Sequence, residues 1–373
     1  MTKRLDSIEL LRCVLMFLII GQHAFLLGVM GDCWDAWTLL FTAFVAWHVD
    51  AFIAITGWFG AKFSPSKIIK LIGLMAWYSL LSVGWMCVAD RGSLSLKNIG
   101  ISGGWFGSTY LMLLCVIPFV NAAIERLSAM PRRMAVFAWS IAALAYSLSW
   151  FPSHLLLPFS PCGVSGQSLF LFAFIYVTVR LLRTQYDVQK IAKRFFIWAC
   201  VAFVAVMTLC GTLALTYRWY KGMPLNGRCF GAWTTCGYDA PHVWLLAIAI
   251  VIVFVTKVHL PKWVGNVCCF LGPSMFGVYL MHTTTSFGEL LYVCPQKWLM
   301  AHVSLHPALV VFLSAVVCFV LCVGADVLRR FLLRGISGPT NRFLSFVDMK
   351  WDANKMNSSM GSSMPHEGPL KYW

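Results

Sequence analysis

The stretch Arg12-Cys-Val-Leu-Met-Phe-Leu-Ile-Ile-Gly-Gln-His23 decides how this chain is interpreted, because it carries two ionisable side chains within an apolar run of membrane-spanning length. The two residues are eleven positions apart, close to three helical turns, so both side chains point to one side of a helix at heights that differ by roughly 16 Å. Ionisable groups are costly in hydrocarbon and normally face a bundle interior or a wet cavity. Histidine also exchanges its proton near neutral pH. The pair therefore predicts chemistry inside a membrane.

The composition predicts a polytopic membrane protein of the all-α class. Of its 373 residues, 60% are hydrophobic and only 12% are charged, whereas soluble domains have about a quarter of their residues charged. The first apolar run has no small-residue cleavage site after it, so we expect it to remain as the first helix. A span needs roughly 20 apolar residues. We expect about ten transmembrane helices, at 8–28, 37–60, 68–89, 104–124, 134–150, 167–183, 195–216, 242–258, 264–288 and 306–328.

The lysines and arginines predict that both termini lie in the cytoplasm. With the N-terminus inside and ten spans, the inner segments hold 22 of the 29 Lys and Arg residues, the outer loops hold six, and Arg12 lies within a span. This asymmetry is the positive-inside pattern. The net charge of +15 does not indicate a nucleic-acid partner, because the basic residues recur between apolar runs and form no single patch.

The domain organisation expected from the sequence is one transmembrane domain at 1–345, followed by a cytoplasmic tail at 346–373. The end of the tail is rich in Ser, Met, Gly and Pro, a composition typical of disorder. The fourteen cysteines include no close-spaced pair of CxxC motifs, so we predict no metal site. Cys229 and Cys236 share one polar loop, and a disulfide between them depends on the compartment that the loop faces.

Three groups of charged residues are candidates for function. Glu9 and Arg12 are i, i+3 neighbours that predict an ion pair, although both could also snorkel to the inner interface. Asp50 falls within a span, where a carboxylate is expensive without a partner. Lys67 and Lys70 are one turn apart at the start of the third span. They are suited to the phosphates of a cytoplasmic cofactor, although basic residues are common at any inner boundary.

Two aromatic or histidine-containing motifs are further candidates. Trp105 begins the fourth span and is either a ligand contact or an ordinary interfacial aromatic residue. His282 ends Ser274-Met-Phe-Gly277-Val-Tyr279-Leu-Met-His282, where Gly277 permits close helix approach. The histidine is either functional or a polar packing contact. Polar residues and a proline interrupt this ninth span, which predicts a broken helix lining a cavity.

Four segments together resemble the acyltransferase three family of bacterial integral membrane proteins that acylate cell-surface sugars. The chain contains no Walker loop, Rossmann glycine fingerprint, HExxH or GxSxG motif that would indicate another chemistry. The segments occur in the family's order over residues 1 to about 330. They are Ser7-Ile-Glu9-Leu-Leu-Arg12 with Gly21-Gln-His23; Val49-Asp50-Ala-Phe-Ile-Ala-Ile-Thr56-Gly57; Trp105-Phe106 with Tyr110, Pro118 and Asn121; and Ser274 to His282.

This resemblance implies transfer of an acetyl or other short acyl group from acyl-CoA to a sugar hydroxyl, in the bacterial cytoplasmic membrane. The expected partners are acyl-CoA, a glycan or lipid-linked sugar acceptor, and membrane lipid. His23 is expected to act as the general base or to carry the acyl group, and Arg12 to bind a CoA phosphate or the oxyanion. The other site residues are supporting ones, namely Glu9, Asp50, Tyr279 and His282, and those for acetyl-CoA, namely Lys67, Lys70 and Trp105.

The sequence departs from the family's usual pattern at two places, and two alternative functions remain. Thr56 stands where the family usually has serine, which keeps the hydroxyl. Lys67 and Lys70 stand where arginines are usual, which keeps the charge but loses the bidentate fork. Buried Arg, His and Asp residues also suit a proton-coupled transporter or exporter, whereas a scaffolding protein would not need them. Asp50 has two predicted roles, orienting His23 or pairing with Arg12.

Overall fold

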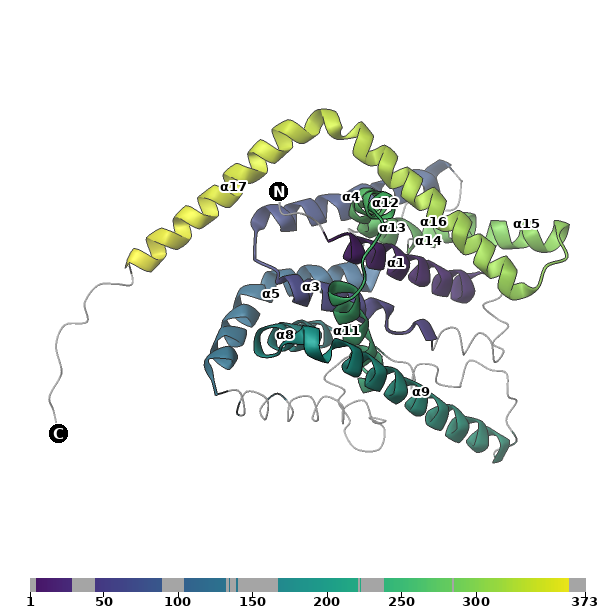
Figure 1. Ribbon diagram of the computed structural model, residues 1–373. Coiled ribbons are helices and arrows are strands. Elements are labelled where there is room, and N and C mark those ends of the chain that lie inside the picture. The colour runs from purple at the N-terminus through teal and green to yellow at the C-terminus, as the bar shows by residue number, and fades with distance from the viewer. Residues whose placement is uncertain are drawn as a thin grey trace.

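The computed structural model describes residues 5–28, 44–88, 104–131, 134, 139, 167–220, 222, 238–283 and 285–361. The elements in these ranges are all helical (Figure 1). They are α1 (Asp6–Leu27), α3 (His48–Phe59), α4 (Pro65–Val88), α5 (Gly104–Ala129), α8 (Leu169–Gln185), α9 (Val188–Tyr220), α11 (Pro241–Thr256), α12 (Lys262–Leu271), the 3-10 turn η4 (Gly272–Ser274), α13 (Met275–His282), α14 (Thr285–Gly288), the π-helical η5 (Glu289–Val293), α15 (Cys294–His302), α16 (Pro307–Leu332) and α17 (Arg334–Gly361).

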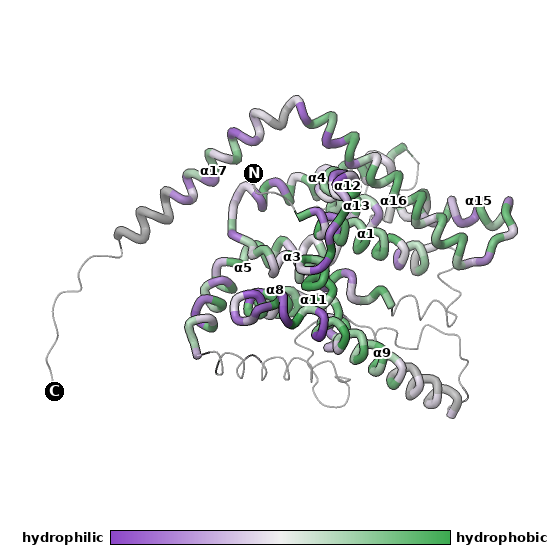
Figure 2. The backbone as a smooth tube through the Cα atoms, viewed as in Figure 1, coloured by the Kyte–Doolittle hydropathy of each residue, from purple (hydrophilic) through white to green (hydrophobic). Residues whose placement is uncertain are grey.

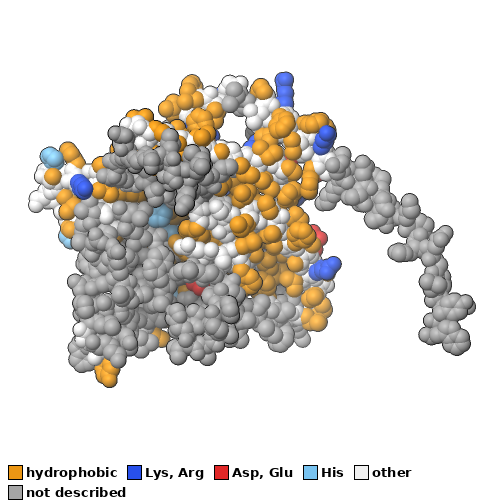
Figure 3. Space-filling model, turned by 180° about the vertical axis from the view of Figure 1, so that it is seen from behind, with side chains coloured by type: hydrophobic (Ala, Val, Ile, Leu, Met, Phe, Trp, Pro, Cys, Tyr) orange, Lys and Arg blue, Asp and Glu red, His pale blue; other side chains and the backbone are white. Residues whose placement is uncertain are grey.

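Six helical segments in the described ranges are long and apolar enough to cross a membrane. They are Asp6–Phe25, Pro65–Val88, Gly104–Ala129, Val188–Leu209, Lys262–His282 and Pro307–Leu332. The all-α membrane fold is thus confirmed, and Figure 2 shows its hydrophobic residues along helices such as α1 and α11. Hydrophobic side chains also cover much of the described surface in Figure 3.

The predicted count of ten spans is not established by these six. Two predicted spans correspond to shorter helices, since α3 has 12 residues and α8 has 17. A third, α11, is an apolar helix of 16 residues. The predicted span at 134–150 lies outside the described residues except for residues 134 and 139, and Cys229 and Cys236 also lie outside them.

The contacts between helices define their directions. Asp6 at the start of α1 lies against Gly265 of α12, and His23 lies beside His282 of α13, so these segments run parallel. Helix α16 runs antiparallel to α1, because Arg330 near its end binds Ser274 at the start of α13. Helix α3 is also antiparallel to α1, because it begins near Gln22 of α1.

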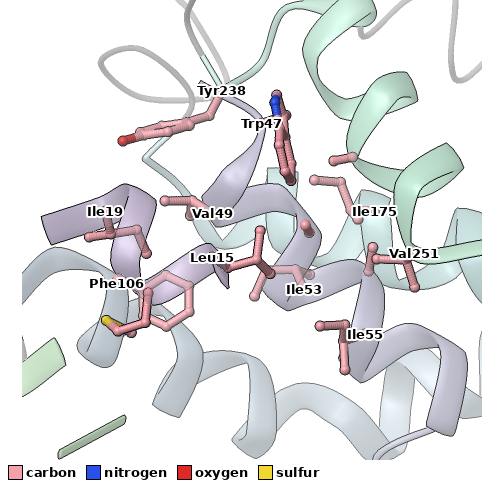
Figure 4. Packing of buried hydrophobic residues seen from close by; sticks show 14 of the residues in the cluster. Leu15, Ile19, Trp47, Val49, Ile53, Ile55, Phe106, Ile175, Tyr238 and Val251 are labelled. Atoms are coloured by element: carbon pink, nitrogen blue, oxygen red, sulfur yellow. The ribbon is translucent and has the colours of Figure 1, made fainter. Parts of the chain in front are cut away.

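The core lies where α1, α3, α8 and α11 meet. Figure 4 shows Leu15 and Ile19 of α1 close to Val49 and Ile53 of α3, all within one buried cluster. Gly57 lets α3 approach α8, because a Cβ there would lie 2.9 Å from the backbone oxygen of Tyr176. Lipid is as apolar as these side chains, so close van der Waals packing through small residues stabilises such contacts.

The ninth predicted span is broken, as its sequence indicated. The turn η4 separates α12 from α13 at Gly272-Pro273-Ser274. Proline lacks a backbone donor and distorts a helix. Gly272 leaves room for the side chain of Glu9, which would collide with any Cβ at this position. The break therefore lets α12 and α13 wrap closely around α1.

One long helix crosses the predicted domain boundary at 346. Residues 334–361 form the single helix α17, which extends away from the end of α16 in Figure 1. Asp348 of α17 accepts hydrogen bonds from the Ser66 hydroxyl at 2.6 Å and from the Ser66 amide at 3.1 Å. Trp351 packs on Phe63, with 5.0 Å between ring centroids. Part of the predicted tail is thus a helix docked on the start of α4.

Candidate active site

A cavity of about 620 Å³ lies within the bundle and contacts α1, α3, α4, α5, η4, α13 and Tyr238. Six of the residues predicted from sequence line it, namely Arg12, His23, Lys67, Lys70, Trp105 and Tyr279. The other three lie behind this wall. Glu9 contacts Arg12, His282 contacts His23, and Asp50 is fully buried in α3. The structure therefore gathers residues that are up to 273 positions apart, from Glu9 to His282, around one space.

One end of the cavity, here called the basic end, carries Arg12, Lys62, Lys67 and Lys70. The predicted ion pair is confirmed, since Arg12 Nη1 lies 2.8 Å from Glu9 Oε1. The side chain of Arg12 remains 33% exposed, whereas that of Glu9 is 4% exposed. Glu9 thus anchors the guanidinium from behind, and the remaining donors of Arg12 stay available to the cavity.

The turn between α3 and α4 holds the basic end in shape. Gly60 has φ +75°, a conformation that favours glycine. The carbonyl of Ala61 accepts a hydrogen bond from Asn121 Nδ2 at 2.9 Å, and the amide of Ala61 donates to Tyr176 Oη at 3.0 Å. These bonds fix the backbone immediately before Lys62. Tyr176 was missed by the sequence reasoning, because it lies in a uniformly apolar stretch without a motif.

The opposite end, here called the histidine end, carries His23, His48, Trp105 and Tyr238. The rings of His23 and His282 are 5.1 Å apart between centroids, with 42° between their planes. His48 Nε2 lies 2.7 Å from Gln22 Oε1. His48 and Gln22 neighbour predicted residues in sequence, but their mutual contact has no sequence signal, because it joins two different helices.

Trp105 and Tyr279 are positioned by the start of α5. Gly104 has φ +57°, and a Cβ there would lie 2.8 Å from Tyr279 Oη. The Tyr279 hydroxyl therefore lies at the N-terminus of α5, where backbone donors lack helical partners. The ring of Trp105 lies 5.4 Å from that of Tyr238. Trp105 precedes Asn121 by sixteen helical positions, or roughly 24 Å, so it lies far from Lys67 and Lys70, the other two residues predicted to bind acetyl-CoA.

Asp50 fulfils neither of its two predicted contacts in this structure. It is fully buried, and its carboxylate oxygens have no hydrogen-bond partner among the described residues. Arg12 is paired with Glu9, and His23 faces His282. The charged group that acts on Asp50 electrostatically is Asp239, in the turn before α11, and two carboxylates repel each other. Asp50 is therefore placed behind the histidine end without a bond to His23.

A second buried polar network was not predicted from sequence. Asp326 of α16 accepts a hydrogen bond from Tyr78 Oη at 2.8 Å and forms an ion pair with Arg329 at 2.9 Å. Gly277 faces Asp326 so closely that no Cβ would fit. This network joins α4, α13 and α16 behind the cavity wall. The described residues contain no group of three or more His, Cys, Asp or Glu side chains that could hold a metal ion.

Comparison with known protein families matches residues 5–327 to the acyltransferase domain of the acyltransferase 3 family. Comparisons with curated proteins and with solved structures give no match. The family match covers most of the chain and includes every residue that lines the cavity. Together with the apolar helices of the bundle, it makes the protein a membrane acyltransferase. The chain belongs to the acyltransferase 3 family.

Proposed function

We propose that this protein transfers an acetyl or other short acyl group from acyl-CoA to a hydroxyl of a cell-surface or exopolysaccharide sugar. The observation that carries the proposal is that this cavity differs in character between its two ends. Four cationic side chains lie at its basic end and a histidine lies in its wall at the other end. A donor with a polyanionic head and a reactive thioester at the end of a long arm matches this arrangement.

The basic end would bind the phosphates of acyl-CoA. Arg12, Lys62, Lys67 and Lys70 supply positive charge, and Glu9 holds Arg12 in place. Partly desolvated cations attract phosphate more strongly than fully exposed ones, because the local dielectric constant is lower. The pantetheine arm would then extend along the apolar wall toward His23, which lies roughly 16 Å from Arg12 along α1. On the basis of that distance, we assign Arg12 to the donor phosphates rather than to the reacting carbonyl.

The transfer would occur beside His23. A sugar hydroxyl is a weak nucleophile, so removal of its proton assists the attack. The hydroxyl oxygen bonds to the thioester carbonyl carbon while its proton passes to Nε2 of His23. The carbon–sulfur bond then breaks, and the imidazolium returns the proton to the CoA thiolate. The products are the sugar ester and free CoA.

The acceptor would enter from the histidine end. Trp105 and Tyr238 offer aromatic surface there, and both line the cavity. We place the basic end toward the cytoplasm of a bacterial cell, because positive residues are enriched on that side and acyl-CoA is cytoplasmic. We therefore assign Trp105, which the sequence grouped with the residues for acetyl-CoA, to the neighbourhood of the acceptor.

The test is the variant His23→Ala in the full-length protein. Loss of a general base is expected to reduce transfer by roughly 10²- to 10⁴-fold. The measurements are acetyl-CoA consumption by the purified protein and the acetyl esters of surface polysaccharide by NMR. His302→Ala serves as the control, because His302 is an exposed histidine of α15 outside the cavity.

Retained surface acetylation in a folded His23→Ala protein would refute the proposal. Proton-dependent solute uptake by the wild-type protein, without acetyl-CoA consumption, would support the transporter alternative. Size-exclusion elution and thermal unfolding of the variant must match those of the wild type, so that loss of activity is not loss of fold.

A further inference from the structure

The tautomer of His282 is determined by its backbone contact. His282 Nδ1 lies 2.7 Å from the carbonyl oxygen of Val278, one turn earlier in α13. A carbonyl oxygen only accepts hydrogen bonds, so Nδ1 carries the proton. In the neutral ring, Nε2 then has a free lone pair. This Nε2 is buried and has no hydrogen-bond partner among the described residues.

His23 presents the complementary nitrogen. Its Nδ1 is also buried without a hydrogen-bond partner in the described part of the chain. The ring keeps partial exposure because it lines the cavity, so the accessible edge is the one that bears Nε2. The two ring centroids are 5.1 Å apart with 42° between the ring planes, so a small rotation is enough to bring these two nitrogens within hydrogen-bond distance.

We propose that His282 is a positioning residue that holds His23 in the tautomer with the proton on Nδ1. The lone pair on His282 Nε2 would accept the Nδ1 proton of His23, which leaves His23 Nε2 unprotonated and facing the cavity. The bond satisfies two buried polar atoms that are otherwise costly. Catalytic hydrogen bonds are often loose before substrate binds, so a small ring rotation completes the contact.

His282 is better placed for this role than the other buried histidine nearby. His48 is held through Nε2 by Gln22, and its ring lies 6.3 Å from that of Tyr238. His282 instead faces His23 ring to ring, and its backbone bond to Val278 fixes the acceptor nitrogen. The proposed chain of contacts therefore runs from the Val278 carbonyl through His282 and His23 to the cavity. This role rests on the proposed function of His23 as the base.

The experiment is ¹⁵N NMR of the full-length protein labelled at its histidines, since ring nitrogen shifts distinguish the two tautomers. His23→Gln assigns the His23 signals. In the wild type we expect protonated Nδ1 and unprotonated Nε2 at His23. His282→Asn keeps a group at the Nδ1 position but removes the acceptor at the Nε2 position, so the Nδ1 tautomer of His23 should be lost. His282→Gln restores an acceptor oxygen near that position and should restore the tautomer.

His302→Asn is the matched control, because His302 Nδ1 makes the same type of contact, 2.9 Å from the carbonyl of Trp298 one turn earlier. It should leave the His23 signals unchanged. Acetyl-CoA turnover should fall roughly 10- to 100-fold in His282→Asn and recover in part in His282→Gln, as for other residues that orient a catalytic group. Unchanged His23 signals in both His282 variants would overturn the proposal. The spectra do not require turnover, so they separate this failure from a failure of the acyltransferase assignment.

Discussion

At the scale of single residues, the pairing with Glu9 fixes the position of the Arg12 guanidinium. The carboxylate is buried, and the guanidinium retains exposed donors toward the cavity. An arginine fork binds phosphate in two places, whereas lysine binds it as a point charge. In the proposed reaction, the height difference of roughly 16 Å between Arg12 and His23 would keep Arg12 away from the bond that breaks.

Arg12→Lys and Arg12→Gln should therefore raise KM for acetyl-CoA and leave kcat within a few-fold of the wild type. We expect about a tenfold rise in KM for Gln, which corresponds to roughly 1.4 kcal/mol of lost binding, and a smaller rise for Lys. Steady-state kinetics with acetyl-CoA measure both constants. A fall in kcat at unchanged KM would instead place Arg12 at the oxyanion.

At the scale of elements, the docking of α17 on α4 depends on Asp348. Its carboxylate accepts hydrogen bonds from the Ser66 hydroxyl and amide and from the Ser64 hydroxyl at the start of α4. These bonds and the nearby Lys67 hold the pKa of Asp348 below its ordinary value. Because docking lowers the pKa of this carboxyl, its charge stabilises the docked state at pH values above the ordinary pKa of an aspartate, which is about 3.9. That stabilisation is lost as the pH falls through the lower folded pKa.

Asp348→Asn should loosen α17 at neutral pH, because the amide keeps the shape but loses the charge that favours these hydrogen bonds. Limited trypsinolysis at Arg342 and Lys350 should become faster than in the wild type. Asp352→Asn is a control on the same helix. In the wild type, the distance between labels attached to α17 and α4 should increase only when the pH falls below the ordinary pKa of an aspartate. Equal cleavage of all three proteins would contradict this account of docking.

At the scale of the whole molecule, cationic residues from separate helices meet at one end of the bundle. Arg183 donates to the carbonyl of Trp58 beside the turn that bears Lys62, and Arg330 binds Ser274 next to the cavity-lining Pro273. The same end receives the C-terminal end of α16 and the docked part of α17. The positive-inside rule predicts that this end faces the cytoplasm.

A reporter of cytoplasmic location fused after residue 373 should therefore be active, whereas an exported enzyme fused there should not. A cysteine that replaces Lys67, in a background without other reactive cysteines, should react with an impermeant maleimide in inverted vesicles but not in intact cells. Reaction from the outer face would show that the topology is the reverse of the predicted one, and that acyl-CoA does not enter from the predicted side.

The sequence by itself was sufficient for the all-helical membrane class, the ion pair of Glu9 with Arg12, the break before α13 and the common side of Arg12 and His23. These features depend on hydropathy, helical periodicity and local spacing, which the linear order contains. Helix ends and span number were less accessible. The short helix α3 and the docked helix α17 are stabilised by contacts with distant segments, so composition alone does not define them.

Only the tertiary structure decided which residues meet. His23 and His282 are 259 positions apart, and no local pattern records that their rings face each other. Trp105 lies near Tyr238 because of the direction of α5, and Asp50 lies behind the cavity because of the rotation of α3. Such placements follow from how helices pack and turn against one another. That packing is a property of the whole chain, because each contact depends on side chains from several separate helices.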